Sequence, residues 1–384
     1  MLSVQTPDQY QRLLQCSCLI LWLAISPLGL ADIRFNGYWM IDEYHEQYPE
    51  QRAISEAFNL RVQSQVEPIP THPDAIKIMV VYPGLQVSDY WRRSVAALTK
   101  RLDLIGINYV LDSQFTKPGT DLNLQSKLIG NAFHDTPDYL IFTLDAIKHK
   151  KLIERVMSQG KTKIILQNIT TPLKSFGNNQ PFLYVGFDHA TGTQLLVKEY
   201  QSRFPSGANY AILFGTQGYV SKIRGGVFES QMNATVNYQL RDSYYVNFNR
   251  NMAKEATLQL IQNHLENDEF KLDFIYAAST DIALGAIDAL QQHDLKEQVI
   301  VNGWGGGSNE LASIKNKVLD FTVMRMNDDN GVAMAEAIAL DLSGRASQVP
   351  TIYSGSFRLI QQGIDPEQLQ RFEKRAFRYS NETP

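Results

Sequence analysis

The chain has 384 residues with a formal net charge of −4 at pH 7, and 44% of its residues are hydrophobic and 20% charged. This composition is typical of a globular protein, and the length suffices for two domains of ordinary size. The slightly acidic balance provides no basic footprint for nucleic acid, so we expect no nucleic-acid partner.

The first 31 residues differ from the rest of the chain. Arg12 precedes an apolar run over residues 18–30, which is interrupted only by Ser26, Pro27 and Gly29. Small residues stand at the −3 and −1 positions of a cleavage site after Ala31. We therefore expect a secretory signal peptide over residues 1–31 and export to the periplasm. The alternative is a transmembrane anchor, but the run is short for a span, so we expect no direct membrane insertion.

Both cysteines, Cys16 and Cys18, lie in this segment. Cleavage would leave a mature chain without cysteine, as a periplasmic protein with a large core can be. This pattern argues against a small secreted fold held by disulfides.

Residues 32–75 are predicted to form an N-terminal extension laid over the domain surface. Four aromatic residues are interleaved with acids in its first part, namely Tyr38, Trp39, Tyr44 and Tyr48. A proline-rich connector over residues 67–73 ends the extension. Alternatively, the aromatic residues of the extension could form a docking surface for a partner.

From residue 76 the chain alternates between strand and helix patterns. A first set predicts strands at 76–82, 107–111, 139–142 and 163–166, with helices near 89–104, 123–132 and 146–158. A second set predicts strands at 182–185, 210–214, 236–240, 274–276 and 299–301. Its helices begin after Asp188, near 221 and 252, and at a cap formed by Ser279 or Thr280. A third set adds helices at 309–315 and 332–342 around a strand at 321–323. The alternation predicts an α/β fold with two Rossmann-like, doubly wound lobes.

The first two sets of strands and helices suffice for two lobes, and a third set follows them. The chain therefore has to cross back between the lobes. We expect an N-terminal lobe over 76–172 plus about 305–325, and a C-terminal lobe over about 173–304 plus 326–360. Residues 361–384 would form a tail. Crossings near 168–181, 304 and 325 would make a three-stranded hinge, which permits the lobes to close on a ligand.

The loop after the first strand carries the first candidate site. In an open parallel sheet, ligands sit at the carboxyl ends of the strands. Pro83 and Gly84 stop the strand, and Gln86, Ser88 and Trp91 follow. An amide, a hydroxyl and an aromatic plane suit a small polyhydroxylated molecule. The loop contains no pair of nucleophile and base, so the pattern favours binding over catalysis.

Four longer segments carry a family resemblance, at residues 81–91, 139–145, 166–172 and 182–190. They resemble type I periplasmic binding proteins of the ribose-binding class, and within it the LuxP-type autoinducer-2 receptors. The resemblance covers essentially the whole mature chain. It implies a non-enzymatic quorum-sensing receptor that binds autoinducer-2, a furanosyl borate diester, between two lobes. It also implies a partner, the periplasmic domain of a LuxQ-type hybrid sensor histidine kinase of a two-component system, which signal binding shifts toward phosphatase activity.

Carried over position by position, the resemblance implies eight ligand-binding residues: Gln86, Ser88, Trp91, Asn168, Arg224, Thr280, Trp304 and Arg325. Ser279 or Asp281 is an alternative to Thr280, and Asp145 is a secondary candidate that could instead cap its helix. The residue types fit the ligand. Two guanidinium groups can neutralise a borate diester of charge −1, amides and hydroxyls match its ring oxygens, and indoles exclude water.

Other interpretations remain open from the residues alone. Trp91 could belong to the core, Asn168 to a turn, and Arg224 to a solvated helix face. The alternative function is a sugar-binding protein of an ABC transporter or chemoreceptor. Borate is expected only as part of the ligand, and no cofactor is expected. The scattered histidines predict no metal site, and the glycines after Trp304 lack the spacing of a phosphate loop. An enzyme and a repressor are both disfavoured.

Overall fold

The computed structural model describes residues 37–70, 74–143, 147–266 and 269–381. The expected signal peptide, its cleavage site and Asp145 lie outside the described residues. Within them, every helix is too short or too polar to cross a membrane.

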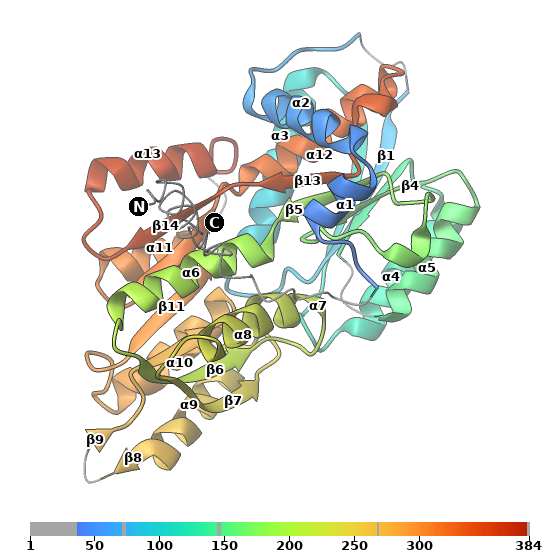
Figure 1. Ribbon diagram of the computed structural model, residues 1–384. Helices are drawn as coiled ribbons and strands as arrows, with labels where there is room; N and C mark the ends of the chain where they lie inside the picture. Colours follow the sequence, from blue (N-terminus) through green and yellow to red (C-terminus); the bar gives the residue numbers. More distant parts are fainter. Residues whose placement is uncertain (1–36, 71–73, 144–146, 267–268, 382–384) are drawn as a thin grey trace, which may run out of the picture. The chain divides into compact units, whose positions relative to one another are not determined.

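Six parallel strands form a first sheet in the order β13-β5-β4-β3-β1-β2. Strands β1, β4, β5 and β13 of this sheet are labelled in Figure 1. They are β1 (Ile76–Tyr82), β2 (Tyr109–Phe115), β3 (Tyr139–Phe142), β4 (Lys163–Gln167), β5 (Leu183–Phe187) and β13 (Ile352–Gly355). The accompanying helices are α3 (Tyr90–Ile105), α4 (Leu122–Asp135), α5 (Ile147–Ser158) and α12 (Asp328–Leu342). We call this sheet with its helices the first lobe.

Strand β1 shows why this sheet is covered on both faces. Side chains of a strand alternate between its two faces. Ile78 and Val80 join a core that includes Leu98 of α3, whereas Met79 and Val81 join a second core with helices α4 and α5. Because both faces are buried, the strand is apolar at every position except the exposed Lys77, and its predicted bounds are confirmed.

A second sheet has the order β14-β12-β11-β10-β6-β7, in which only β14 is antiparallel to its neighbour. Its strands are β6 (Ala208–Phe214), β7 (Tyr238–Tyr245), β10 (Phe274–Ala277), β11 (Ile300–Gly305), β12 (Phe321–Arg325) and β14 (Phe357–Gln361). Its helices are α6 (His189–Arg203), α7 (Tyr219–Ser221), α8 (Val227–Asn233), α9 (Arg250–His264), α10 (Thr280–Gln292) and α11 (Ser308–Lys315). This is the second lobe. The remaining elements outside the terminal segments are a two-stranded pair, β8 (Leu265–Glu266) with β9 (Glu269–Phe270), two 3₁₀ turns, Lys174–Phe176 and Ala346–Gln348, and a π-helical turn, Lys222–Gly226.

Three crossings join the lobes, as expected, but two of them lie elsewhere than expected. The chain crosses between β5 and α6 at Asp188, between β12 and α12 after Arg325, and between β13 and β14 at Ser356. The crossing near 325 is confirmed. Those near 168–181 and 304 are wrong, because β5 pairs with β4 in the first sheet and β11 pairs with β12 in the second.

The expected lobe boundaries change accordingly. Residues 305–325 belong to the second lobe and not the first, since β12 lies between β11 and β14. Helix α12 and strand β13 belong to the first lobe, because α12 packs along α3 and β13 pairs with β5. An apolar strand pattern does not specify which sheet the strand joins, so sequence patterning alone cannot fix these crossings.

The N-terminal extension is part of the first lobe's core and is not a surface layer alone. It contains α1 (Ile41–Gln47) and α2 (Glu50–Gln63), and α2 packs against α12. Phe58 and Val62 are fully buried there. The buried carboxylate of Glu336 accepts hydrogen bonds from Arg61 of α2 and Arg101 of α3, at 2.5 and 2.7 Å.

The C-terminal residues connect the two lobes. Helix α13 (Pro366–Ala376) forms an ion pair with α11 of the second lobe, between Lys315 and Glu373. The following turn returns to the first lobe, where Asp328 accepts hydrogen bonds from Ser380. We call residues 366–380 the C-terminal strap.

Candidate ligand-binding site

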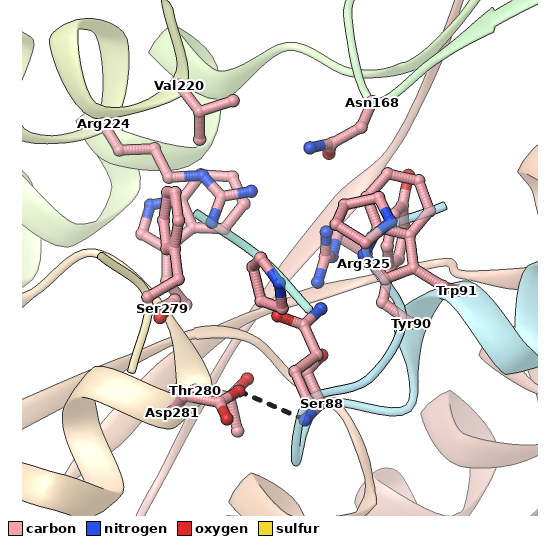
Figure 2. Close-up of a pocket in the computed structure, with 15 residues that line it drawn as sticks. Ser88, Tyr90, Trp91, Asn168, Val220, Arg224, Ser279, Thr280, Asp281 and Arg325 are labelled. Carbon is pink, nitrogen blue, oxygen red and sulfur yellow. Dashed lines mark hydrogen bonds between the residues drawn. The ribbon is translucent and has the colours of Figure 1, made fainter. Parts of the chain in front are cut away.

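A cavity of about 60 Å³ opens where loops and strand ends of both lobes meet. All eight residues of the predicted main set line it. Figure 2 shows the guanidinium groups of Arg224 and Arg325 and the amide of Asn168 directed into the same space. The structure thus brings the predicted residues together, and their contact with a ligand stays a prediction.

The first lobe contributes the loop after β1 and the residue after β4. Gly84 is required at the loop's start, because a Cβ there would lie 2.3 Å from the Phe115 ring. Trp91 packs its ring 4.6 Å from that of Tyr82 and also lines the cavity, so its core and site roles coexist. Asn168 has φ 65°, a left-handed conformation that asparagine tolerates, and its buried Oδ1 has no hydrogen-bond partner.

The second lobe presents Arg224 on a π-helical turn, Lys222–Gly226. π-helical turns are often found at functional sites. The guanidinium carbon lies 3.7 Å above the Trp304 ring. Its Nε donates to Nδ1 of His189 at 3.2 Å, and its Nη1 donates to the carbonyl of Ala278 at 3.0 Å. Burial, reinforced by the neighbouring Arg325, lowers the pKa of Arg224 well below its ordinary value.

Arg325 ends strand β12 and also lines the cavity. Its guanidinium lies 3.9 Å from the centre of the Tyr90 ring and 5.8 Å from that of Trp304. Its buried Nε has no hydrogen-bond partner. Burial lowers the pKa of Arg325 as well.

Arg224 and Arg325 differ from other buried arginines in whether a carboxylate pairs with them. Arg93 is paired with Asp89 at 2.6 Å, and Arg101 is paired with Glu336 at 2.5 Å. Among the described residues, neither Arg224 nor Arg325 forms an ion pair with a carboxylate. Burying an unpaired charge is unfavourable unless a counter-ion compensates it. The cavity is therefore suited to an anion.

Three neighbouring residues at the start of α10, Ser279, Thr280 and Asp281, all line the cavity. Ser279 caps the helix and accepts from the amide of Ile282. Asp281 accepts from the amides of Val87 and Ser88. Both alternatives are thus engaged by the protein, and Thr280 remains the one that we expect to face a ligand.

Several lining residues were not anticipated from the sequence. They are Pro83, Tyr90, Pro118, Val220 and Phe248. Tyr90 could have been suspected from the sequence because it is the aromatic neighbour of Trp91 at the start of α3. Phe248, in a turn with φ 53°, follows no recognisable pattern. No group of histidine, cysteine or acidic side chains that could hold a metal ion occurs in the described part of the chain.

Comparison with known proteins identifies the family. Residues 78–346, well over half of the chain, match the family described as "Periplasmic binding protein domain". The chain belongs to this family. All eight predicted site residues of this periplasmic binding protein fall inside the matched region.

Individual relatives are more distant. The ribose import binding protein RbsB of Bacillus subtilis is 25% identical over 165 residues, which are 43% of this periplasmic binding protein and 51% of the relative. The match thus spans about half the length of that relative.

Solved structures share the fold over most of the chain. An ABC transporter solute-binding protein from Actinobacillus succinogenes, solved with D-allose, superposes with a TM-score of 0.64 at 20% identity, covering 77% of this chain and 99% of that one. One from Agrobacterium vitis with D-fucose gives 0.68 at 15% identity, covering 77% and 98%. At these identities the likeness establishes the two-lobed fold and not the ligand.

Proposed function

We propose that this periplasmic binding protein is a non-enzymatic receptor for autoinducer-2, held as its furanosyl borate diester between the two lobes. One observation carries the proposal: Arg224 and Arg325 are buried at the cavity without a carboxylate partner among the described residues. A ligand of charge −1 would compensate part of this buried positive charge, whereas a neutral sugar would leave all of it.

The remaining groups suit the same ligand. Guanidinium groups donate in a planar fork to the oxygens of an oxyanion, and a charge-assisted hydrogen bond is roughly twice as strong as a neutral one. Asn168 Oδ1, which is buried without a hydrogen-bond partner, offers an acceptor for a hydroxyl. Burial of both arginines excludes water and strengthens these contacts.

Signal relay would follow from closure of the lobes. Ser88 and Asn168 come from the first lobe, and Arg224, Thr280 and Arg325 come from the second. Because only the closed arrangement brings all donors onto one ligand, the ligand favours that arrangement. The closed receptor would then be recognised in the periplasm by a LuxQ-type hybrid sensor histidine kinase.

A second candidate is a sugar-binding protein of an ABC transporter or chemoreceptor. The fold of the proteins solved with D-allose and D-fucose favours it, as does the RbsB relative. Function resides in the site and not in the fold, so the two candidates are distinguished by the charge of the ligand.

Calorimetric titration of the purified mature chain tests both. The titrants are the autoinducer-2 precursor in borate-depleted buffer, the same precursor with added borate, and neutral D-ribose and D-allose. We expect strong heat only with borate present. Equal affinity with and without borate would contradict the anionic ligand, and tight binding of a neutral sugar would establish the second candidate.

A further inference from the structure

His189 is a buried titratable residue at the first crossing between the lobes. It is the first residue of α6, directly after Asp188, and only 1% of its surface is exposed. Its ring centre lies 5.2 Å from that of Trp304. His189 does not line the cavity, so any effect on a ligand must act through another residue.

The two ring nitrogens of His189 determine its tautomer. Nε2 lies 3.1 Å from the backbone carbonyl of Asn168, which can only accept, so Nε2 carries the proton. Nδ1 accepts from Nε of Arg224 at 3.2 Å. Only the neutral Nε2–H form satisfies both hydrogen bonds, because an imidazolium would direct a second N–H at the guanidinium.

The electrostatic surroundings agree with a neutral ring. Arg224 and Arg325 are the charged groups that face it. Burial, and then Arg224, lower the pKa of His189 well below its ordinary value. The ring therefore adds no third positive charge to the cavity.

We propose that His189 is a positioning residue that orients Arg224 toward the ligand and couples it, across the hinge, to Asn168. With Nε held by His189 and Nη1 by the Ala278 carbonyl, Arg224 keeps its Nη2 edge for an anion. The same imidazole holds the backbone of Asn168, whose side-chain Oδ1 is unpartnered. One ring thus fixes one ligand group from each lobe. The inference deepens the proposed function, on which its ligand rests.

Substitution tests this role against a purely structural one. H189Q can still donate to Asn168 and accept from Arg224, whereas H189F fills the site without either hydrogen bond. H149F removes another fully buried histidine, remote from the cavity on α5, and is the control.

With the autoinducer-2 precursor in borate buffer, we expect H189F to bind roughly 10- to 100-fold more weakly, the range for losing a hydrogen bond to a charged group. H189Q and H149F should stay within a few-fold of the wild type. Wild-type affinity in H189F, or equal losses in H189Q and H189F, would overturn the proposal.

A second measurement requires no ligand. Two-bond ¹⁵N–¹H correlation spectra of the ¹⁵N-histidine-labelled protein distinguish the tautomers, and the H189Q spectrum identifies the signal among the seven histidines. We expect a neutral Nε2–H ring that does not titrate over roughly pH 5 to 8, the range in which an ordinary histidine changes charge. An Nδ1–H tautomer, or titration in that range, would overturn the inference. Failure of the wild type to bind the borated signal would contradict only the proposed function, because the tautomer is measured independently.

Discussion

The carboxylate of Asp281 in the second lobe accepts a hydrogen bond of 3.2 Å from the backbone amide of Ser88 in the first (Figure 2). Its other oxygen accepts from the amide of Val87 at 2.9 Å. Burial raises the pKa of Asp281, and these two amides oppose that effect. These two hydrogen bonds therefore link the loop that carries Gln86 and Ser88 to the helix that carries Thr280.

We predict that D281N weakens ligand binding. An asparagine can accept only one of the two amides and directs an NH₂ group at the other. Loss of a hydrogen bond to a charged acceptor costs about 1.5–3 kcal/mol, which corresponds to roughly 10- to 100-fold in affinity. Calorimetric titration with the borated signal measures this loss of affinity. The control is D288N on the same helix, which removes the ion pair with Arg250 and should leave affinity unchanged. Equal affinity of D281N and the wild type would show that the link does not favour closure.

Replacing Arg325 should have opposite effects on the free and the bound protein. Because burial lowers the pKa of Arg325, its charged form is less favourable in the folded than in the unfolded protein. R325M removes that cost, so we expect the unliganded protein to unfold at the same or a higher temperature. Binding of the anionic ligand should weaken by about 2–5 kcal/mol, as for other buried charged contacts.

Thermal unfolding with and without borated signal measures both effects of R325M. R203M is the control, because Arg203 lies over an aromatic ring but is paired with Glu199 and is remote from the cavity. R203M should show the same ligand-induced rise in unfolding temperature as the wild type. A ligand-induced shift of wild-type size in R325M would contradict an anion at this position.

How far the sequence predicts this fold is illustrated by β1 and β11. Strand β1 is buried on both faces, so its composition alone defines its bounds. Strand β11 is also almost entirely buried, yet its pairing with β12, which assigns it to the second lobe, depends on contacts that no local pattern encodes. The elements between residues 76 and 342 were therefore largely predictable. Helices α1, α2 and α13, which lies in the predicted tail, strands β13 and β14, and two of the three crossings were not.

The site shows the same limit. Gln86, Ser88 and Trp91 follow a strand end, where a ligand is expected from general rules. Arg224, taken alone, resembles a solvated arginine, and only the family resemblance selected it. Its burial arises from the π-helical turn and from Gly225, whose Cβ would lie 2.1 Å from Phe214. Such packing between distant segments is not visible in a single sequence.

Two helical glycines provide a test of how rigidly Trp304 is held. A Cβ on Gly192 would lie 2.9 Å from both Trp304 and Phe357, whereas a Cβ on Gly130 would meet nothing within 4 Å. We expect G192A to displace the indole beneath Arg224 and to weaken binding by roughly tenfold, in line with about 0.5–2 kcal/mol for a cation–π contact. G130A should leave binding unchanged and raise stability by about 0.5–1 kcal/mol. Calorimetry measures the affinity of both variants, and urea unfolding measures their stability. Wild-type affinity in G192A would mean that the Trp304 ring can shift without weakening ligand binding.

The C-terminal strap should make the stability of the protein depend on pH. Asp328 accepts hydrogen bonds from the amides of Tyr379 and Ser380 and from the Ser380 hydroxyl. Burial nevertheless raises the pKa of Asp328 to about 6, above its unfolded value of about 3.9. Between these values the folded protein binds more protons than the unfolded chain, so the contribution of Asp328 to stability falls as pH rises from about 4 to about 6.

Urea unfolding across this pH range measures the contribution as the difference between the wild type and D328N. An asparagine keeps an acceptor for the two amides and a donor for the hydroxyl but cannot titrate. We expect the difference in unfolding free energy to change by on the order of 2–4 kcal/mol between about pH 4 and pH 7, in favour of D328N at the higher pH. S380A removes a hydroxyl that favours the charged carboxylate, so the pKa of Asp328 should rise further and the stability of S380A should fall with pH at least as steeply as that of the wild type. Parallel profiles for D328N and the wild type would mean that Asp328 titrates normally and that the strap stays docked independently of its charge.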